Sequence, residues 1–157
     1  MATNDLTADE RRKTALAVHE RHLVLMLEKD MPAWIDLWAD DGIFEFPFAP
    51  PGFPTCLEGK EAIREYIKDY PQHIDLAAFQ DVRVHPTVDP EVLVVEMRAE
   101  GRIVATGKPY EMSYVAVITV ADGKITRYRD YWNPLTALEM LGGAEALTAA
   151  FAGADDA

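Results

Sequence analysis

Apolar residues in the first thirty positions recur with the spacing of an amphipathic helix. Leu16, Leu23 and Leu27 fall on one stripe of a helix that would run from about residue 8 to residue 29. Thr7 precedes this stripe and Glu10 follows three residues later, which is the spacing of an N-terminal capping box. The pattern therefore predicts one long helix with a defined start.

Two shorter helices are predicted after it. Pro32 favours the first turn of a helix over about 32–39, which Asp40-Asp41-Gly42 is expected to end. The next helix is expected over 61–70, closed by Pro71.

Between these helices the spacing is that of a strand followed by a loop. Phe44, Phe46 and Phe48 alternate over 43–48 and would share one face of a strand. Residues 49–59 contain three prolines and two glycines, so this stretch is expected to be a loop without regular structure. A loop of this length is long enough to cover a pocket.

After residue 71 the pattern changes to the alternation typical of β-strands. Strands are expected over 79–86, 91–99, 110–120 and 124–132, with 102–105 continuing the second of them beyond a kink at Gly101. Asn133-Pro134 would end the last strand, because proline has no N–H for the ladder. A C-terminal helix is expected over 135–151, with a frayed tail at 152–157.

Helices followed by a run of antiparallel strands predict an α+β fold in a single domain over residues 1–157, with its core at about 8–141. We expect a cone-shaped α+β barrel, in which the N-terminal helices pack on a curved, mainly antiparallel sheet. Such a cone can hold a small molecule. The sheet's other face would still need a cover, which predicts a homodimer. Val115 and Val117 are the apolar residues expected there.

Composition narrows the possible partners. The formal net charge is −12 and no basic run exceeds three residues, so neither nucleic acid nor a membrane surface is an expected partner. The single cysteine, Cys56, excludes an internal disulfide. No apolar stretch is typical of a signal peptide or a membrane span, so we expect a cytoplasmic protein.

The last strand carries the candidate chemistry. One face would hold Thr126, Tyr128, Asp130 and Trp132, and the opposite face Ile125, Arg127, Arg129 and Tyr131. A carboxylate among aromatic rings is costly unless it is paired or its pKa rises until it holds a proton. Asp130 is therefore the candidate acid–base residue.

Each candidate has a structural alternative. Asp130 could form a salt bridge with Arg98 or Arg102 on a neighbouring strand. His22 could face the pocket, where its ordinary pKa suits proton transfer, or lie at the helix edge bonded to backbone. His19 is expected to be exposed. No HExxH pattern or carboxylate cluster accompanies the two histidines, so no metal is expected.

Aromatic residues supply the candidate substrate contacts. The expected substrate-binding residues are Phe46, Phe48, Tyr114, Tyr128 and Trp132. All five could equally be ordinary core residues, with one or two of them lining a pocket for a flat ligand. Glycine-rich phosphate loops, nucleotide fingerprints and a Ser-His-Asp order are missing from the sequence, so no cofactor is expected.

Three local stretches carry a family resemblance. They are Leu37-Trp38-Ala39-Asp40-Asp41-Gly42 with Phe44-Glu45-Phe46-Pro47, Leu57-Glu58-Gly59-Lys60-Glu61-Ala62-Ile63, and Asp122-Gly123-Lys124-Ile125 with Arg129-Asp130-Tyr131-Trp132-Asn133-Pro134. The sequence resembles the SnoaL-like and ketosteroid-isomerase-like group of the nuclear-transport-factor-2-like superfamily. The last stretch is most similar to the phenazine-biosynthesis A/B-type proteins, as are Tyr110-Glu111 and Tyr114.

The resemblance implies roles for two residues. It places the last-strand carboxylic acid of the phenazine-type proteins at Asp130, and the oxyanion donor of the steroid isomerases at His22. The implied function is a cofactor-free isomerase, cyclase or dehydratase of secondary metabolism, acting on a small hydrophobic or aromatic substrate by acid–base catalysis. The alternative is a non-catalytic ligand-binding or assembly module of the same fold.

Overall fold

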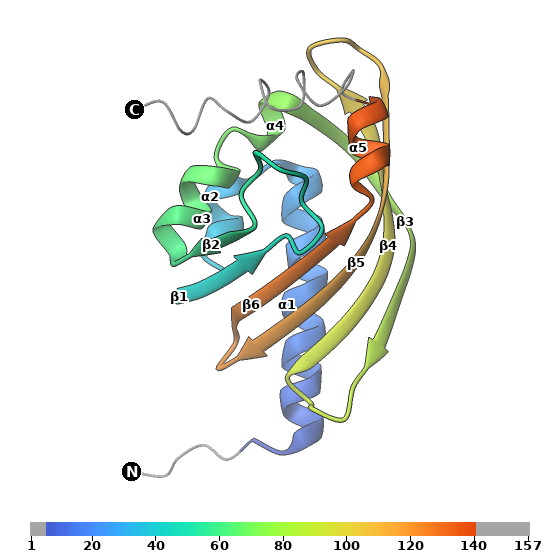
Figure 1. Ribbon diagram of the computed structural model, residues 1–157. Coiled ribbons are helices and arrows are strands. Elements are labelled where there is room, and N and C mark those ends of the chain that lie inside the picture. Colours follow the sequence, from blue (N-terminus) through green and yellow to red (C-terminus); the bar gives the residue numbers. More distant parts are fainter. Residues whose placement is uncertain (1–5, 141–157) are drawn as a thin grey trace.

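The computed structural model describes residues 6–140, in which the first four helices and two short strands precede four long consecutive strands and a last short helix (Figure 1). In chain order the elements are α1 (Ala8–Glu28), α2 (Met31–Ile35), β1 (Trp38–Glu45), β2 (Cys56–Glu58), α3 (Lys60–Ile67), α4 (Tyr70–His73), β3 (Ile74–Pro86), β4 (Val92–Ile103), β5 (Pro109–Ala121), β6 (Lys124–Trp132) and α5 (Pro134–Met140). This arrangement confirms the predicted α+β class.

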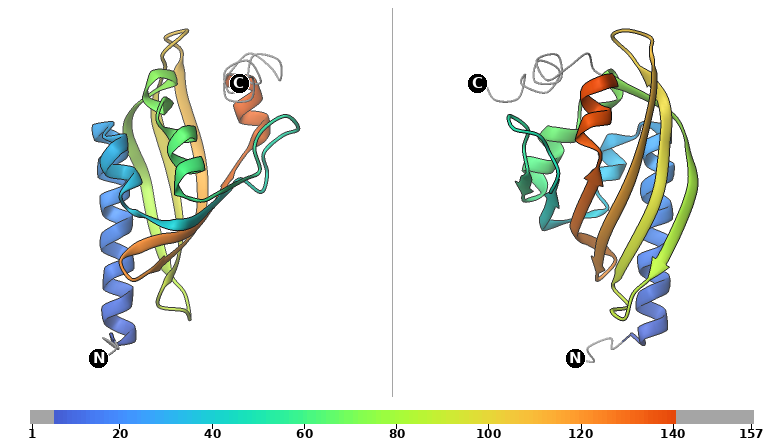
Figure 2. Two further views of the ribbon diagram at one scale, coloured as in Figure 1. Left: turned by 90° about the vertical axis from the view of Figure 1, so that its left-hand side faces the viewer. Right: turned by 45° about the vertical axis from the view of Figure 1, so that its right-hand side comes forward.

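The strands form one curved six-stranded sheet in the order β2-β1-β6-β5-β4-β3. Only β1 and β6 pair in parallel, and the other neighbours are antiparallel. The long strands β3 to β6 bend around the helices, and α1 runs along the sheet on that side (Figure 2). The result is the predicted cone, closed by helices on the inner face of the sheet.

The long helix α1 begins where the capping box predicts. The Thr7 hydroxyl accepts a hydrogen bond from the Glu10 backbone N–H at 3.2 Å, and the Glu10 carboxylate accepts one from the Thr7 N–H at 2.8 Å. Lys29 ends the helix with a left-handed φ of 61°. No helix of the described residues is long and apolar enough to span a membrane.

The region after α2 differs from the prediction. The second helix is only Met31–Ile35, and Trp38 already begins β1. Asp40-Asp41-Gly42, predicted to end a helix, lies inside that strand. Pairing with distant segments overrides the local turn signal: the Ile125 N–H donates to the Leu37 carbonyl, and the Gly59 N–H to the Gly42 carbonyl, each at 2.8 Å.

The phenylalanine strand also ends earlier than predicted. β1 stops at Glu45, so Phe48 lies in the following turn with 58% of its surface exposed. The centroid of its ring lies 5.1 Å from the centroid of the Tyr131 ring. The loop prediction for 49–59 was wrong for Cys56–Glu58, which pairs with β1 as the short edge strand β2.

The middle of the chain is divided differently as well. α3 ends at Ile67, and Pro71 lies in the first turn of the separate helix α4 instead of closing α3. β3 begins at Ile74, five residues before the predicted start at 79. The strand predicted to kink at Gly101 continues to Ile103, as β4.

The strand register shifts at several places in the sheet, and two of these places bear on the sequence predictions. At Gly101 an added Cβ would lie 2.2 Å from the Asp75 carbonyl oxygen, so only glycine permits the close approach of β3 and β4 beside their register shift. A second shift, between β5 and β6, turns Ile125 inward, where it is 1% exposed. Its predicted place on the arginine face was therefore wrong.

The C-terminal helix starts close to the predicted position. α5 covers Pro134–Met140, and the Asn133 side chain accepts a hydrogen bond from the Leu135 N–H at 2.9 Å. The remainder of the helix predicted over 135–151, and the tail at 152–157, lie outside the described residues.

Candidate active site

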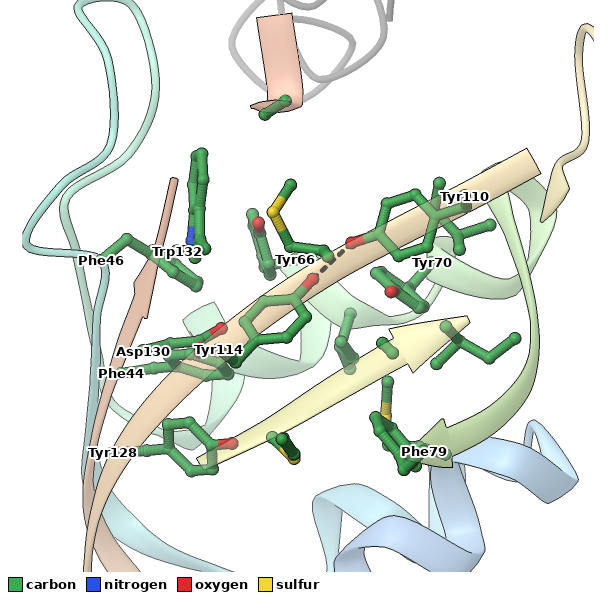
Figure 3. A pocket seen from close by; sticks show the side chains of 18 of the residues that line it. Phe44, Phe46, Tyr66, Tyr70, Phe79, Tyr110, Tyr114, Tyr128, Asp130 and Trp132 are labelled. Carbon is green, nitrogen blue, oxygen red and sulfur yellow. Dashed lines mark hydrogen bonds between the residues drawn. The ribbon is translucent and has the colours of Figure 1, made fainter. Parts of the chain in front are cut away.

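A cavity of about 140 Å³ lies between the helices and the inner face of the sheet (Figure 3). Its lining is His22, Met26, Trp34, Phe44, Phe46, Phe53, Tyr66, Ile67, Tyr70, Ile74, Leu76, Phe79, Met97, Ala99, Tyr110, Met112, Tyr114, Tyr128, Asp130, Trp132, Ala137 and Met140. Rings and aliphatic chains dominate the lining, and none of these residues is a lysine or an arginine. The polar groups are one carboxyl, one imidazole, two indoles and five phenols.

Asp130 projects into this cavity from β6. It stands opposite Ala116 of β5, a residue too small to shield it. Its Oδ1 atom is buried and has no hydrogen-bond partner among residues 6–140. Burial raises the pKa of Asp130 from 3.8 to about 8. Near neutral pH the carboxyl is therefore mainly a neutral acid.

The two arginines that could have paired with Asp130 are engaged elsewhere. Arg98 bonds to Asp81 at 3.2 Å and also to Glu100. Arg102 lies 3.4 Å from Asp75. Neither cation therefore neutralises the cavity carboxyl.

Five tyrosines surround the carboxyl. They are Tyr66, Tyr70, Tyr110, Tyr114 and Tyr128. Burial is the main cause that raises the pKa of each phenol, and the nearby Asp130 charge raises it further. All five are therefore neutral hydroxyls at physiological pH, able to donate one hydrogen bond each.

Part of this tyrosine group is linked internally. The Tyr110 and Tyr114 hydroxyls form a short hydrogen bond, drawn as the dashed line in Figure 3. Tyr70 lies close enough to Tyr110 for each phenol to affect the pKa of the other. The three hydroxyls therefore form a polar strip along one wall of an otherwise apolar cavity.

His22 reaches the same cavity from α1. The Trp34 indole N–H donates to His22 Nδ1 at 2.6 Å, and the Tyr128 hydroxyl lies 3.5 Å from His22 Nε2. Burial lowers the pKa of His22 to about 3, with His19 adding to the effect. His22 is thus a neutral imidazole. The predicted exposure of His19 was wrong, since only 2% of its surface is accessible.

The structure brings most of the sequence-predicted site residues together. Phe46, Tyr114, Tyr128 and Trp132 line the cavity that contains His22 and Asp130. Phe48 does not, because it follows the end of β1 and is exposed.

Sequence reasoning missed three tyrosines of the site. Tyr66 lies on the buried stripe of α3 between Ile63 and Ile67, so helical periodicity could have identified it. Tyr110 alternates with Tyr114 on β5, which was a signal of the same kind. Tyr70 had no such signal, because α4 is a single turn.

Metal chemistry finds no support in the part of the chain that the structure describes. Across residues 6–140, no three His, Cys, Asp or Glu side chains gather closely enough to hold a metal ion. The chemistry that these residues themselves can perform is proton transfer by a neutral carboxylic acid, with phenols as hydrogen-bond donors.

Comparison with known sequences gives one family and several relatives. A model described as the SnoaL-like domain matches residues 19–128. The uncharacterised protein YesE of Bacillus subtilis is 47% identical over 124 residues, which cover 79% of this chain and 84% of YesE. The uncharacterised PhzA/B-like protein PA3332 of Pseudomonas aeruginosa is 40% identical over 126 residues, which cover 80% of this chain and 89% of PA3332.

Solved structures show the same similarity. A Bacillus subtilis protein, named as a proposed isomerase, has a TM-score of 0.82 and 44% identity, covering 85% of this chain and 96% of that one. The Mycobacterium tuberculosis protein RV0760c, solved in complex with estradiol-17β-hemisuccinate, has a TM-score of 0.67. At 22% identity, over 76% of this chain and 94% of RV0760c, the likeness is one of fold.

Proposed function

Because this chain belongs to the SnoaL-like domain family, we propose that it is a cofactor-free enzyme that moves a proton within a small, uncharged, unsaturated substrate. The family resemblance predicted from the sequence is confirmed by the matching domain and by the PhzA/B-like relative. Isomerisation, cyclisation and dehydration are the reaction types that such a proton transfer serves.

One observation carries the proposal: the Asp130 carboxyl faces a cavity lined by neutral hydroxyls, and its buried Oδ1 atom has no hydrogen-bond partner among residues 6–140. With a pKa of about 8, the neutral form exceeds the carboxylate by about ten to one at pH 7. A general acid works best when its pKa lies close to the working pH, because it then both holds and releases its proton readily. Asp130 meets that condition, and an ordinary aspartate would not.

The reaction can be written so that protons balance. Asp130 gives its proton to a carbon or oxygen of the substrate and becomes a carboxylate. The carboxylate then takes a proton from a neighbouring carbon, which restores the acid and leaves the substrate isomerised. Where the protonated group is a hydroxyl, it leaves as water, and the same two transfers give a dehydration. Neither route consumes an external reagent.

The cavity limits the size and charge of the substrate. Its volume of about 140 Å³ is close to the roughly 150 Å³ apolar cavity that is known to hold benzene. One six-membered ring with small substituents therefore fits without rearrangement. Because the lining offers no cation, an anionic substrate would lose its hydration without gaining an ion pair.

Isomerisation of cyclohex-3-enone to the conjugated cyclohex-2-enone tests the proposal, since it moves one proton between two carbons of a single ring. We expect the wild-type protein to accelerate the rise in absorbance of the conjugated product, and Asp130→Asn to reduce the rate ~100-fold or more. Asp41→Asn, at an exposed position, is the matched control. Equal rates for wild type and Asp130→Asn across a panel of small enones would refute acid–base catalysis by Asp130.

A binding protein without catalysis is the second candidate, favoured by the mainly apolar lining and by the steroid derivative bound to RV0760c. Quenching of the tryptophan fluorescence from Trp34 and Trp132, which line the cavity, would report binding of cyclohex-2-enone. Binding that is equal in wild type and Asp130→Asn, together with no turnover in either, would favour this role. The PhzA/B-like relative leads us to propose secondary metabolism as the setting of an enzyme.

A further inference from the structure

Three side chains at the α1 side of the cavity form a directed chain of hydrogen bonds. Trp34 of α2 lies 2.6 Å, nitrogen to nitrogen, from His22 Nδ1, and His22 Nε2 lies 3.5 Å from the Tyr128 hydroxyl of β6. All three residues line the cavity. Trp34 and Tyr128 are at most 3% exposed and His22 is 6% exposed, so water does not replace these contacts.

The chemistry of the three groups fixes where each proton lies. An indole nitrogen can only donate, so His22 Nδ1 must be the acceptor and carries no proton. A neutral imidazole then has its proton on Nε2. That N–H can only donate, and its partner is the Tyr128 oxygen. The Tyr128 hydroxyl therefore accepts from His22, and its own proton is free to be donated.

We infer that Tyr128 donates its hydroxyl proton as a hydrogen bond to an oxygen of the substrate, and that Trp34 and His22 are positioning residues that aim it. The inference deepens the proposed function, because it assumes that a substrate with an oxygen atom reacts in this cavity. Tyr128 stabilises negative charge as it develops on that oxygen while Asp130 moves the proton.

Two other phenols of the cavity, those of Tyr110 and Tyr114, are less suited to this task. The Tyr110 and Tyr114 hydroxyls are bonded to each other, so at least one of their protons is already used. Among residues 6–140, the Tyr128 hydroxyl has no hydrogen-bond partner apart from His22. It also stands two residues from Asp130 on the same strand, which separates the two side chains by roughly 7 Å. They can therefore contact two different atoms of one ring.

The distance of 3.5 Å between His22 and Tyr128 has a mechanistic consequence. Catalytic hydrogen bonds are often long in the free protein and tighten when the substrate binds. As the Tyr128 hydroxyl donates to the substrate, its oxygen becomes a stronger acceptor, and the contact with His22 Nε2–H should shorten. The positioning chain would thus stabilise the charged stage of the reaction more than the resting state.

Nitrogen-15 NMR of the imidazole rings tests the positioning chain without any substrate. The chain has four histidines, so the His22 signals are identified by their loss in His22→Gln. We expect the proton of His22 on Nε2 at pH 7 in the wild-type protein. In Trp34→Phe, which removes the only N–H bonded to Nδ1, we expect a mixture of the two neutral forms.

Trp38→Phe is the matched control. Trp38 is a fully buried indole beside Trp34, but its N–H has no hydrogen-bond partner in the described structure. Its loss should leave the His22 proton on Nε2. A wild-type His22 that carries its proton on Nδ1, or on both nitrogens, would overturn the inference.

Turnover of cyclohex-3-enone tests the donor role. Tyr128→Phe keeps the ring and should reduce kcat by 10²–10³-fold, as does the loss of one oxyanion donor elsewhere. Trp34→Phe should reduce kcat about 10-fold with little change in KM, because it affects the orientation of the Tyr128 hydroxyl and not the binding of the substrate. Tyr131→Phe, on the outer face beside Phe48, should have no effect.

The outcomes separate this inference from the proposed function. Full activity in Tyr128→Phe, with Asp130→Asn inactive, would refute the donor role and leave acid–base catalysis standing. Activity that is unaffected in both variants would refute both. Loss of activity in both variants, with the His22 proton on Nε2, supports both.

Discussion

Replacing Asp130 by asparagine should make the protein more stable at neutral pH. Burial holds the pKa of this carboxyl at about 8 in the folded protein, against 3.8 for the exposed group of the unfolded chain. Between these values the folded protein keeps the proton that the unfolded chain has released. The free energy of unfolding therefore falls as the pH rises through this window. The stability that the folded protein gains from holding this proton is fully present only below pH 4.

The size of the effect follows from the same two values. At pH 7 the solution lies about 3.2 pH units above the unfolded value, and each unit is worth about 1.36 kcal/mol. The cost of keeping Asp130 buried is then on the order of 4 kcal/mol, as an upper limit, because water entering the cavity would reduce it. Asparagine resembles the neutral acid in shape and carries no titrating proton, so it avoids this cost at every pH.

Urea denaturation of wild type and Asp130→Asn between pH 4 and pH 9, at one protein concentration, measures the difference. We expect nearly equal stability at pH 4 and a difference in favour of Asp130→Asn that grows toward an upper limit of about 4 kcal/mol at pH 7. In thermal unfolding this corresponds to roughly 8–16 °C for a chain of this size. Asp41→Asn, exposed on β1, should show no such trend.

Two results would contradict the reasoning. A difference in stability that is independent of pH between pH 4 and pH 9 would mean that the pKa of Asp130 is the same in the folded and unfolded states, so that burial does not raise it. A difference that grows toward low pH would mean that the pKa of Asp130 is lowered, as an ion pair would require.

Three further predictions follow from the structure. Turnover of cyclohex-3-enone should fall as the pH rises through about 8, because the acid form of Asp130 is lost; a rate that rises there would make Asp130 a base. Gly101→Ala should lose several kcal/mol of stability in urea denaturation, since its Cβ would meet the Asp75 carbonyl at 2.2 Å; a loss under ~1 kcal/mol would show that β3 can move away. Light scattering at ~10 μM should give the mass of a homodimer, and Val115→Lys, placed at a 40% exposed valine of the outer sheet face, should give the monomer; a monomeric wild type would refute the dimer.

The sequence predicted most reliably the site residues that lie on one strand, β6. Alternation along β6 put Tyr128, Asp130 and Trp132 on one face, and all three line the cavity. That inference needs only the alternation of side chains between the two faces of a strand. The alternation is regular in the part of β6 that follows its bulge. It failed at Ile125, because a bulge shifts the repeat by one residue and depends on the neighbouring strand.

Long-range pairing accounts for most of the other errors. Asp40-Asp41-Gly42 is a local turn signal, yet hydrogen bonds to segments distant in sequence hold it in β1. Phe48 shows the opposite case, because the alternation of phenylalanines continues past the true end of the strand. His19 was misplaced because α1 packs against three strands, which buries more than its leucine stripe.

Burial shifts the pKa of the imidazole and the pKa of the carboxyl in the cavity in opposite directions, and it leaves both groups uncharged. Loss of hydration lowers the pKa of His22 to about 3 and raises that of Asp130 to about 8, so both groups are uncharged at pH 7. A histidine would ordinarily be the preferred proton carrier at this pH, but here it cannot take a proton without leaving its bond with Trp34. In the mechanism that we propose, the aspartate is therefore the acid, and the histidine orients a phenol. A cavity without net charge, lined by hydroxyl donors and aromatic rings, favours a substrate whose charge develops only during the reaction.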